Sequence, residues 1–201
     1  MTGRGAESWK LILSRLNAIL LNSNEWNGLI SQEARSSGWC GAQPAEEIDI
    51  LGAEQRLGIT LPSSYRAFLT VSNGWHPFSS FIERLLPVQE IGPFQTADPQ
   101  RLALLLNWHQ VDDVPDSVYL DYETPENSEV LRLRYYPDCI LVGKPYGVES
   151  DMLLLNPQVI FPDGEWETIF FANWIPGNQR FRSFRAFVEH SIDSEEKFAK
   201  S

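Results

Sequence analysis

Apolar residues recur every three or four positions near both ends of the chain, a spacing typical of helices that bury one face. From Trp9 to Leu20 this pattern predicts a first helix over about residues 7–22. The same spacing near the carboxyl end predicts a last helix over about residues 183–192, followed by a frayed tail over residues 193–201. Each terminal helix should therefore offer an apolar face to the rest of the fold.

Two further helices are predicted on either side of Gly58. The first runs over about residues 45–57 and stops at Gly58, because glycine readily takes the left-handed conformation that follows many helices. The second begins at Pro62, whose missing N–H is no loss in a first helical turn, and ends at Asn73-Gly74. The two helices should form a corner whose apolar side needs a sheet to cover it.

Short apolar runs separated by turn residues predict a sheet in the second half of the chain. The predicted strands cover residues 84–91, 130–135, 139–143, 151–155 and 166–171. A helix from Asp98 to about Trp108 interrupts them, because Asp98 suits the N-cap and Pro99 the first helical position. Helices, then strands, then one helix predict an α+β fold, with a mostly antiparallel sheet on which the N-terminal helices and the C-terminal helix pack.

A chain of 201 residues with 43% apolar residues fits a single domain with a substantial core. Residues 1–44 are expected to be an N-terminal extension, in which residues 27–44 are mostly loop because Ser, Gly and Gln are frequent there. No run approaches the roughly 18 apolar residues of a membrane helix, and the first residues lack the apolar stretch of a signal peptide. The sequence therefore predicts a single domain over residues 1–201 and favours a location in the cytoplasm.

The formal net charge of −11 at pH 7 is concentrated in one part of the chain. Between Leu102 and Gln179 there are 13 acidic and three basic residues, whereas the rest of the chain is close to neutral. Such a surface should repel nucleic acid and anionic membranes and attract a basic protein. Acidic surfaces also serve solubility alone, and both explanations remain open.

The corner between the two middle helices carries a spaced motif that continues to the end of the second helix. Its members are Glu54, Leu57, Gly58, Leu61, Pro62, Tyr65, Phe68, Leu69, Asn73 and Gly74. This motif resembles the signature of the SUKH superfamily, and more narrowly that of the Smi/Knr family. Later segments match in the same order: LLPVQEI at 85–91, ILVG at 140–143, DMLLL at 151–155, GEW at 164–166 and SF at 183–184. The resemblance covers about residues 45–192, with an insert at about 95–138 that departs from the family pattern.

The resemblance implies a SUKH-like α+β fold and a role without catalysis. Bacterial members of the family are mostly immunity proteins, which bind and neutralise a cognate toxin. Fungal members are scaffolds in cell-wall signalling. A non-catalytic, cofactor-free protein of one of these two kinds is therefore expected.

Residues with potential catalytic or metal chemistry are scattered along the chain. The histidines His76, His109 and His190 have no second ligand at metal spacing, so no metal site is predicted. Cys40 and Cys139 are far apart, which favours buried free thiols over a disulfide. Two carboxylates, at positions 165 and 167, are expected to share one face of a strand, but an acid/base pair would also need a cleft. The sequence therefore gives no support for an enzyme.

Charge and family resemblance together lead to one functional hypothesis. A toxin that grips a phosphate backbone, such as a nuclease, needs a cationic cleft, and an acidic protein can fill that cleft. We predict a cytoplasmic immunity protein against such a basic toxin, monomeric or weakly dimeric, without direct nucleic-acid or membrane binding. The alternative is a regulatory scaffold of the Smi/Knr type. The predicted partner-binding residues are Asp112, Asp113, Asp116, Asp121, Glu123, Glu126 and Glu129, with Glu149 and Asp151 second.

Overall fold

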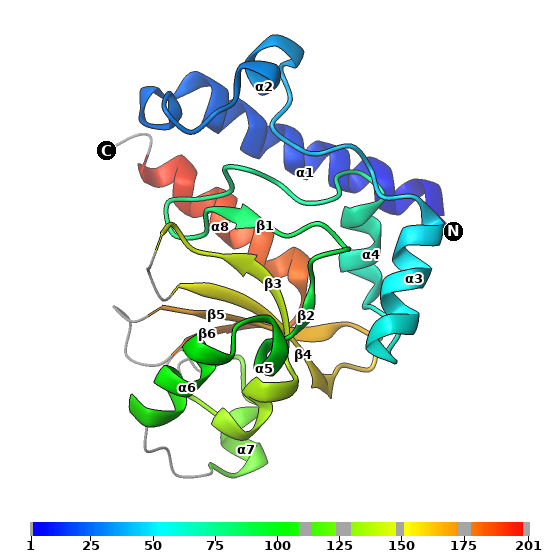
Figure 1. The fold of residues 1–201 in the computed structure, drawn as a ribbon, viewed down its shortest axis with the longest axis vertical. Coiled ribbons are helices and arrows are strands. Elements are labelled where there is room, and N and C mark those ends of the chain that lie inside the picture. The colour runs from blue at the N-terminus through cyan, green and yellow to red at the C-terminus, as the bar shows by residue number, and fades with distance from the viewer. Residues whose placement is uncertain (1, 109–113, 124–129, 148–150, 173–177, 199–201) are drawn as a thin grey trace.

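Six strands form one antiparallel sheet at the centre of the molecule, as Figure 1 shows. The computed structural model describes residues 2–108, 114–123, 130–147, 151–172 and 178–198. The strands are β1 (Arg84–Leu85), β2 (Gly92–Pro93), β3 (Ile140–Lys144), β4 (Met152–Ile160), β5 (Trp166–Phe171) and β6 (Asn178–Phe181). Their order is β1-β3-β4-β5-β6, and β2 also pairs with β3. The predicted α+β class with a mostly antiparallel sheet is confirmed.

Helices lie on both sides of this sheet along the long axis of the molecule (Figure 1). The helices are α1 (Thr2–Asn22), α2 (Gln32–Ser37), α3 (Glu47–Leu57), α4 (Ser63–Leu69), α5 (Phe94–Ala97), α6 (Pro99–Trp108), α7 (Asp116–Tyr119) and α8 (Phe184–Phe198), with 3-10 helices η1 (Asn24–Trp26) and η3 (Leu133–Asp138). In Figure 1, α1 and α2 lie at one end of the long axis, and α6 and α7 lie at the other. Within the described ranges, no helix combines the length and apolar character needed to cross a membrane.

An aromatic cluster joins α1, α4 and α8 in the core. The ring of Trp9 lies 5.6 Å from that of Phe68 and 5.7 Å from that of Phe184. Tyr65 makes an edge contact of 4.8 Å with Phe184. All four side chains are buried, and burial of each large apolar side chain contributes about 1.5–3 kcal/mol. The first helix, which lies outside the family-like region, is therefore part of the same core.

The Asn73-Gly74 pair connects this helical layer to the sheet. Asn73 accepts a hydrogen bond from the backbone N–H of Val88 through Oδ1, at 2.7 Å. Gly74 has φ of +95°, and a Cβ there would lie 2.8 Å from the carbonyl oxygen of Leu85. Only glycine fits this close approach without displacing backbone. The predicted end of the second middle helix at this pair is wrong, because α4 already ends at Leu69.

Several other predicted boundaries differ from the structure. The strand predicted over residues 130–135 is wrong: Leu133–Asp138 is the 3-10 helix η3. The predicted tail is helical as far as Phe198, because Glu195 in its last turns is buried and accepts hydrogen bonds from Ser80. The strand predicted over residues 84–91 is limited to β1 at residues 84–85. The elements that were not predicted include α2 within the supposed loop, β6 at the edge of the sheet, and η1, β2, α5 and α7.

Candidate partner-binding surface

The family-like motif builds the corner between α3 and α4. Glu54 accepts a hydrogen bond from the N–H of Leu61 at 2.7 Å and forms an ion pair with Arg66 at 2.6 Å. Gly58 ends α3 with φ of +69°, as predicted. The apolar members Leu61, Pro62, Tyr65, Phe68 and Leu69 are buried, and Leu57 is half-buried. These contacts are structural, and we assign the motif to the fold and not to a binding face.

Four of the nine predicted partner-binding residues lie in the described part of the chain. Asp116 begins α7, and Asp121 and Glu123 follow within the next turn, where the Asp121 carboxylate accepts the Glu123 N–H at 2.9 Å. Asp151, by contrast, is buried just before β4, so it does not belong to the same outer surface. The other five, Asp112, Asp113, Glu126, Glu129 and Glu149, lie outside the described residues.

An arginine partly offsets the charge of α7. The Asp116 carboxylate is 75% exposed and lies 2.7 Å from the guanidinium of Arg132, which is itself buried. Arg132 also donates to the carbonyl oxygen of Val114 at 2.6 Å and lies over the Tyr119 ring at 4.3 Å. Asp116 is thus a paired carboxylate. Glu123 is exposed, and Asp121 is half-buried.

A buried polar network under α7 holds this segment against the sheet. Its centre is Glu167 on β5, which accepts hydrogen bonds from Tyr119 Oη at 2.8 Å and Tyr122 Oη at 2.5 Å. Asn156 on β4 donates to the same carboxylate at 2.7 Å, and Arg180 on β6 forms an ion pair with it at 3.0 Å. Burial, and next the charge of Glu167, raises the pKa of both tyrosines well above 10, so they remain hydrogen-bond donors. The network fixes residues 119–122 in place.

The expected pairing of two carboxylates on one strand face is wrong. Glu167 is fully buried, whereas Glu165 lies in the turn before β5 and accepts a hydrogen bond from the N–H of Ser64 at 2.8 Å. Glu165 also accepts from the Ser63 hydroxyl, so it anchors the start of α4. The two acids therefore serve different structural contacts.

Apolar side chains are exposed beside the carboxylates of α7. Leu120 is 48% exposed and Ile160, at the end of β4, is 59% exposed. The rings of Tyr122 and Phe161 meet at 5.4 Å, which brings the segment after α7 next to the end of β4. Sequence patterns missed Leu120 and Ile160 as a pair, because tertiary contacts bring their two segments together, among them this ring contact and the hydrogen bonds to Glu167. We call Asp116, Leu120, Asp121, Glu123 and Ile160 the α7 surface.

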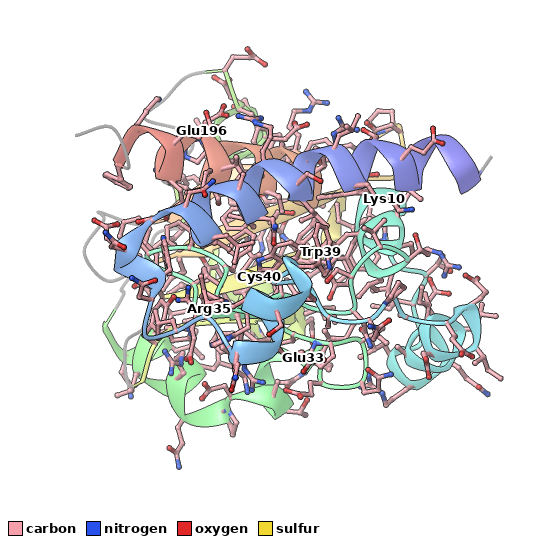
Figure 2. The ribbon with its side chains drawn as sticks, turned by 90° about the horizontal axis from the view of Figure 1, so that it is seen from above. Lys10, Glu33, Arg35, Trp39, Cys40 and Glu196 are labelled. Atoms are coloured by element: carbon pink, nitrogen blue, oxygen red, sulfur yellow. The ribbon has the colours of Figure 1, made fainter. Side chains whose placement is uncertain are left out.

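A groove of about 850 Å³ is lined on one side by α2 and the residues that follow it, and on the other by residues around β1. Figure 1 shows α2 at the end of the molecule away from α7. One wall comes from the N-terminal extension, including Glu33 on α2 and Trp39 and Cys40 shortly after it; Figure 2 labels all three. The other wall includes Gly74 and Trp75, and the Trp39 and Trp75 rings meet edge to face at 4.9 Å. Sequence analysis missed this groove, because nothing local indicates that the two tryptophans meet.

Cys40 and Cys139 are buried free thiols, as predicted. In the part of the chain that the structure describes, no group of three or more His, Cys, Asp or Glu residues could hold a metal ion.

Comparison with known proteins places this architecture in a family. No curated protein sequence matches the chain. Residues 44–190 match the model of the family described as SMI1 / KNR4 family (SUKH-1), which is well over half of the chain. The match begins directly before α3, so the corner motif, the Asn73-Gly74 turn and the whole sheet lie inside it. The chain therefore belongs to the SMI1 / KNR4 family (SUKH-1).

Proposed function

We propose that this protein is a non-catalytic immunity protein that binds and neutralises a cognate toxin, with the α7 surface as part of the contact. Family membership is consistent with this role. The observation that carries the choice of surface is the combination of Asp121 and Glu123 with exposed Leu120 and Ile160. Protein interfaces typically surround apolar contacts with a polar rim.

The rigidity of the α7 surface supports the same role. Binding costs free energy when loops must be ordered, and a preorganised surface avoids part of this cost. Tyr119 and Tyr122 attach the backbone of this segment to buried Glu167, so its side chains start from a fixed frame. A tight inhibitor benefits from such a frame.

The charge supports a basic toxin as the partner. The chain carries a net charge of −11, and 13 of its acids fall between Leu102 and Gln179. Complementary charge speeds the encounter of two proteins, and a nuclease cleft is cationic because it must bind phosphates. We therefore propose that the partner is a nuclease-like toxin, and that this protein binds it in the cytoplasm as a monomer or weak dimer. Five further acids, Asp112, Asp113, Glu126, Glu129 and Glu149, lie outside the described residues and are proposed as contacts from the sequence alone.

A growth-rescue assay with matched charge variants tests the proposal. Each large reading frame flanking the gene is expressed with and without this protein, and growth and binding rates are measured. Asp121→Asn with Glu123→Gln should slow association and flatten its salt dependence, and Leu120→Asp should weaken binding further. The control is Glu7→Gln with Glu25→Gln, which removes the same charge from exposed positions in and just after α1. Equal effects of the two double variants would contradict a specific α7 contact.

The groove between α2 and Trp75 favours a second candidate, a regulatory scaffold of the Smi/Knr type. A scaffold must hold more than one partner, and no residue of the α7 surface lines this groove. In that case Trp39→Ala should release one partner while α7 variants release another, and no toxin would be neutralised.

A further inference from the structure

A cavity of about 220 Å³ lies between α8, the neighbouring ends of β5 and β6, and residues 79–82. Phenyl rings form much of its wall, from Phe81, Phe170, Phe187 and Phe198. The Phe81 ring lies 6.2 Å from that of Phe170 and 6.4 Å from that of Phe198, and the rings of Phe170 and Phe187 are 6.0 Å apart. Successive ring contacts therefore join these four residues along the wall.

A buried carboxylate also lines this cavity. Glu195 on α8 is only 4% exposed, and its two oxygens accept hydrogen bonds from the N–H and hydroxyl of Ser80 at 2.8 and 3.0 Å. Burial raises the pKa of Glu195. The hydrogen bonds from Ser80 act in the opposite direction, and the nearby charge of Glu25 raises the pKa further. Among the described residues, no lysine or arginine forms an ion pair with Glu195. A buried carboxylate without a cation is costly, so its retention calls for an explanation.

The second titratable group in the wall, His190, carries no positive charge at neutral pH. His190 lines the cavity, and burial, with the nearby charge of Lys197, lowers its pKa below 6.5. The imidazole is therefore neutral at pH 7. The cavity thus combines a buried carboxyl group, aromatic rings and a neutral imidazole.

We propose that this cavity binds a small organic cation that carries an alkylated ammonium group. Aromatic faces attract such cations through their quadrupole, and a carboxylate supplies the counter-charge. Drug-sized ligands occupy pockets of about 300–1,000 Å³, so the smaller volume here restricts the ligand to a compact molecule. This site is separate from the α7 surface and its ligand is independent of the proposed toxin.

The test compares a cation with its uncharged twin. Choline and 3,3-dimethylbutan-1-ol have the same shape, but only choline is charged, and each is titrated into the full-length protein by calorimetry and by NMR. Choline is expected to bind saturably, and the alcohol about tenfold more weakly. Glu195→Gln should lower the affinity for choline about tenfold, because it removes the counter-charge and keeps the side-chain shape.

Two further variants keep the test decisive. Glu196→Gln removes the same charge from the next residue of α8, which does not line the cavity. The Glu196 carboxylate forms an ion pair with Arg15 of α1 at 2.9 Å, and Figure 2 shows Glu196 on α8, beside α1. The choline affinity of this variant should stay unchanged. If Glu195→Gln does not fold, Phe198→Ala at a 51% exposed ring should weaken choline binding without disturbing the core. The proposal is overturned by no saturable binding of choline, by equal binding of the alcohol, or by unchanged affinity in the folded Glu195 or Phe198 variant.

Discussion

Glu167 on β5 and Arg180 on β6 form a fully buried ion pair, with 3.0 Å between Oε1 and Nη1. The Arg180 guanidinium also lies 4.0 Å above the Tyr119 ring and donates to the Tyr119 carbonyl oxygen. One pair of charges thus links two strands of the family domain to the insert that carries α7. The strength of this link determines how firmly the α7 surface is held.

The first prediction concerns the loss of one member of this pair. Arg180→Met leaves the Glu167 carboxylate buried without its cation, and breaking a buried pair in this way costs about 3–5 kcal/mol. Urea unfolding followed by tryptophan fluorescence measures the loss. The control is Arg185→Ala, which removes the exposed partner of Glu189 on α8 and should cost about 0.3–0.5 kcal/mol. Similar losses in the two variants would mean that the buried network does not anchor the insert.

The second prediction concerns the hydroxyl of Tyr65. The side chain is buried in the aromatic cluster, and its Oη has no hydrogen-bond partner among the residues that the structure describes. Tyr65→Phe should therefore raise the free energy of unfolding, by about 1 kcal/mol, because it removes an unsatisfied polar group. Thermal unfolding at pH 7 measures the change, and a destabilised variant would contradict it.

The same variant has a pH signature whose direction follows from linkage. Burial raises the pKa of Tyr65 above its usual value of 10.0, so above pH 10 the unfolded chain loses a proton that the folded chain keeps. Stability of the wild type should therefore be insensitive to this group below pH 10 and fall as pH rises above it. Because Phe does not titrate, the advantage of Tyr65→Phe should grow above pH 10.

The third prediction compares two glycines with positive φ. At Gly58 a Cβ would meet open space, so Gly58→Ala should cost only the left-handed strain of about 1–2 kcal/mol. At Gly74 the same strain adds to a clash with the backbone of Leu85 and Pro87. Gly74→Ala should therefore destabilise the protein clearly more than Gly58→Ala in chemical denaturation. Equal losses would show that the turn after α4 can move away from β1.

Sequence patterns predicted the elements whose signals are local. The N-cap of α6 is one example, because Asp98 accepts the N–H of Arg101 at 3.1 Å, three residues away. Gly58 at the end of α3 is another. The strand predicted over residues 130–135 does not form. Arg132 instead donates a hydrogen bond to the carbonyl oxygen of Val114, which is far from it in the sequence. Period and composition do not reveal such a distant partner.

The candidate surface was harder to predict for the same reason. The charge count does not show that Asp151 is buried while Glu123 is exposed. Nor does it show that Asp116 meets Arg132, or that Leu120 stays exposed while neighbouring Tyr119 is buried. These differences arise from the way the insert packs on β4 and β5. Charge counting therefore indicates an acidic segment but not the role of each residue in it.

The last prediction concerns the boundary of the folding unit. The family match begins at residue 44, yet Trp9 of α1 contacts Phe68 of α4 and Phe184 of α8. A chain cut to residues 44–190 would also lose the end of α8 and expose the aromatic cluster to water. It should be unfolded or aggregated in circular dichroism and gel filtration. In the full chain, Trp9→Ala should cost about 3–5 kcal/mol, whereas exposed Leu11→Ala on the same helix should change stability by no more than about 0.5 kcal/mol. A cooperative, monomeric 44–190 fragment would instead make the first helix an accessory, and the domain boundary would then follow the family match.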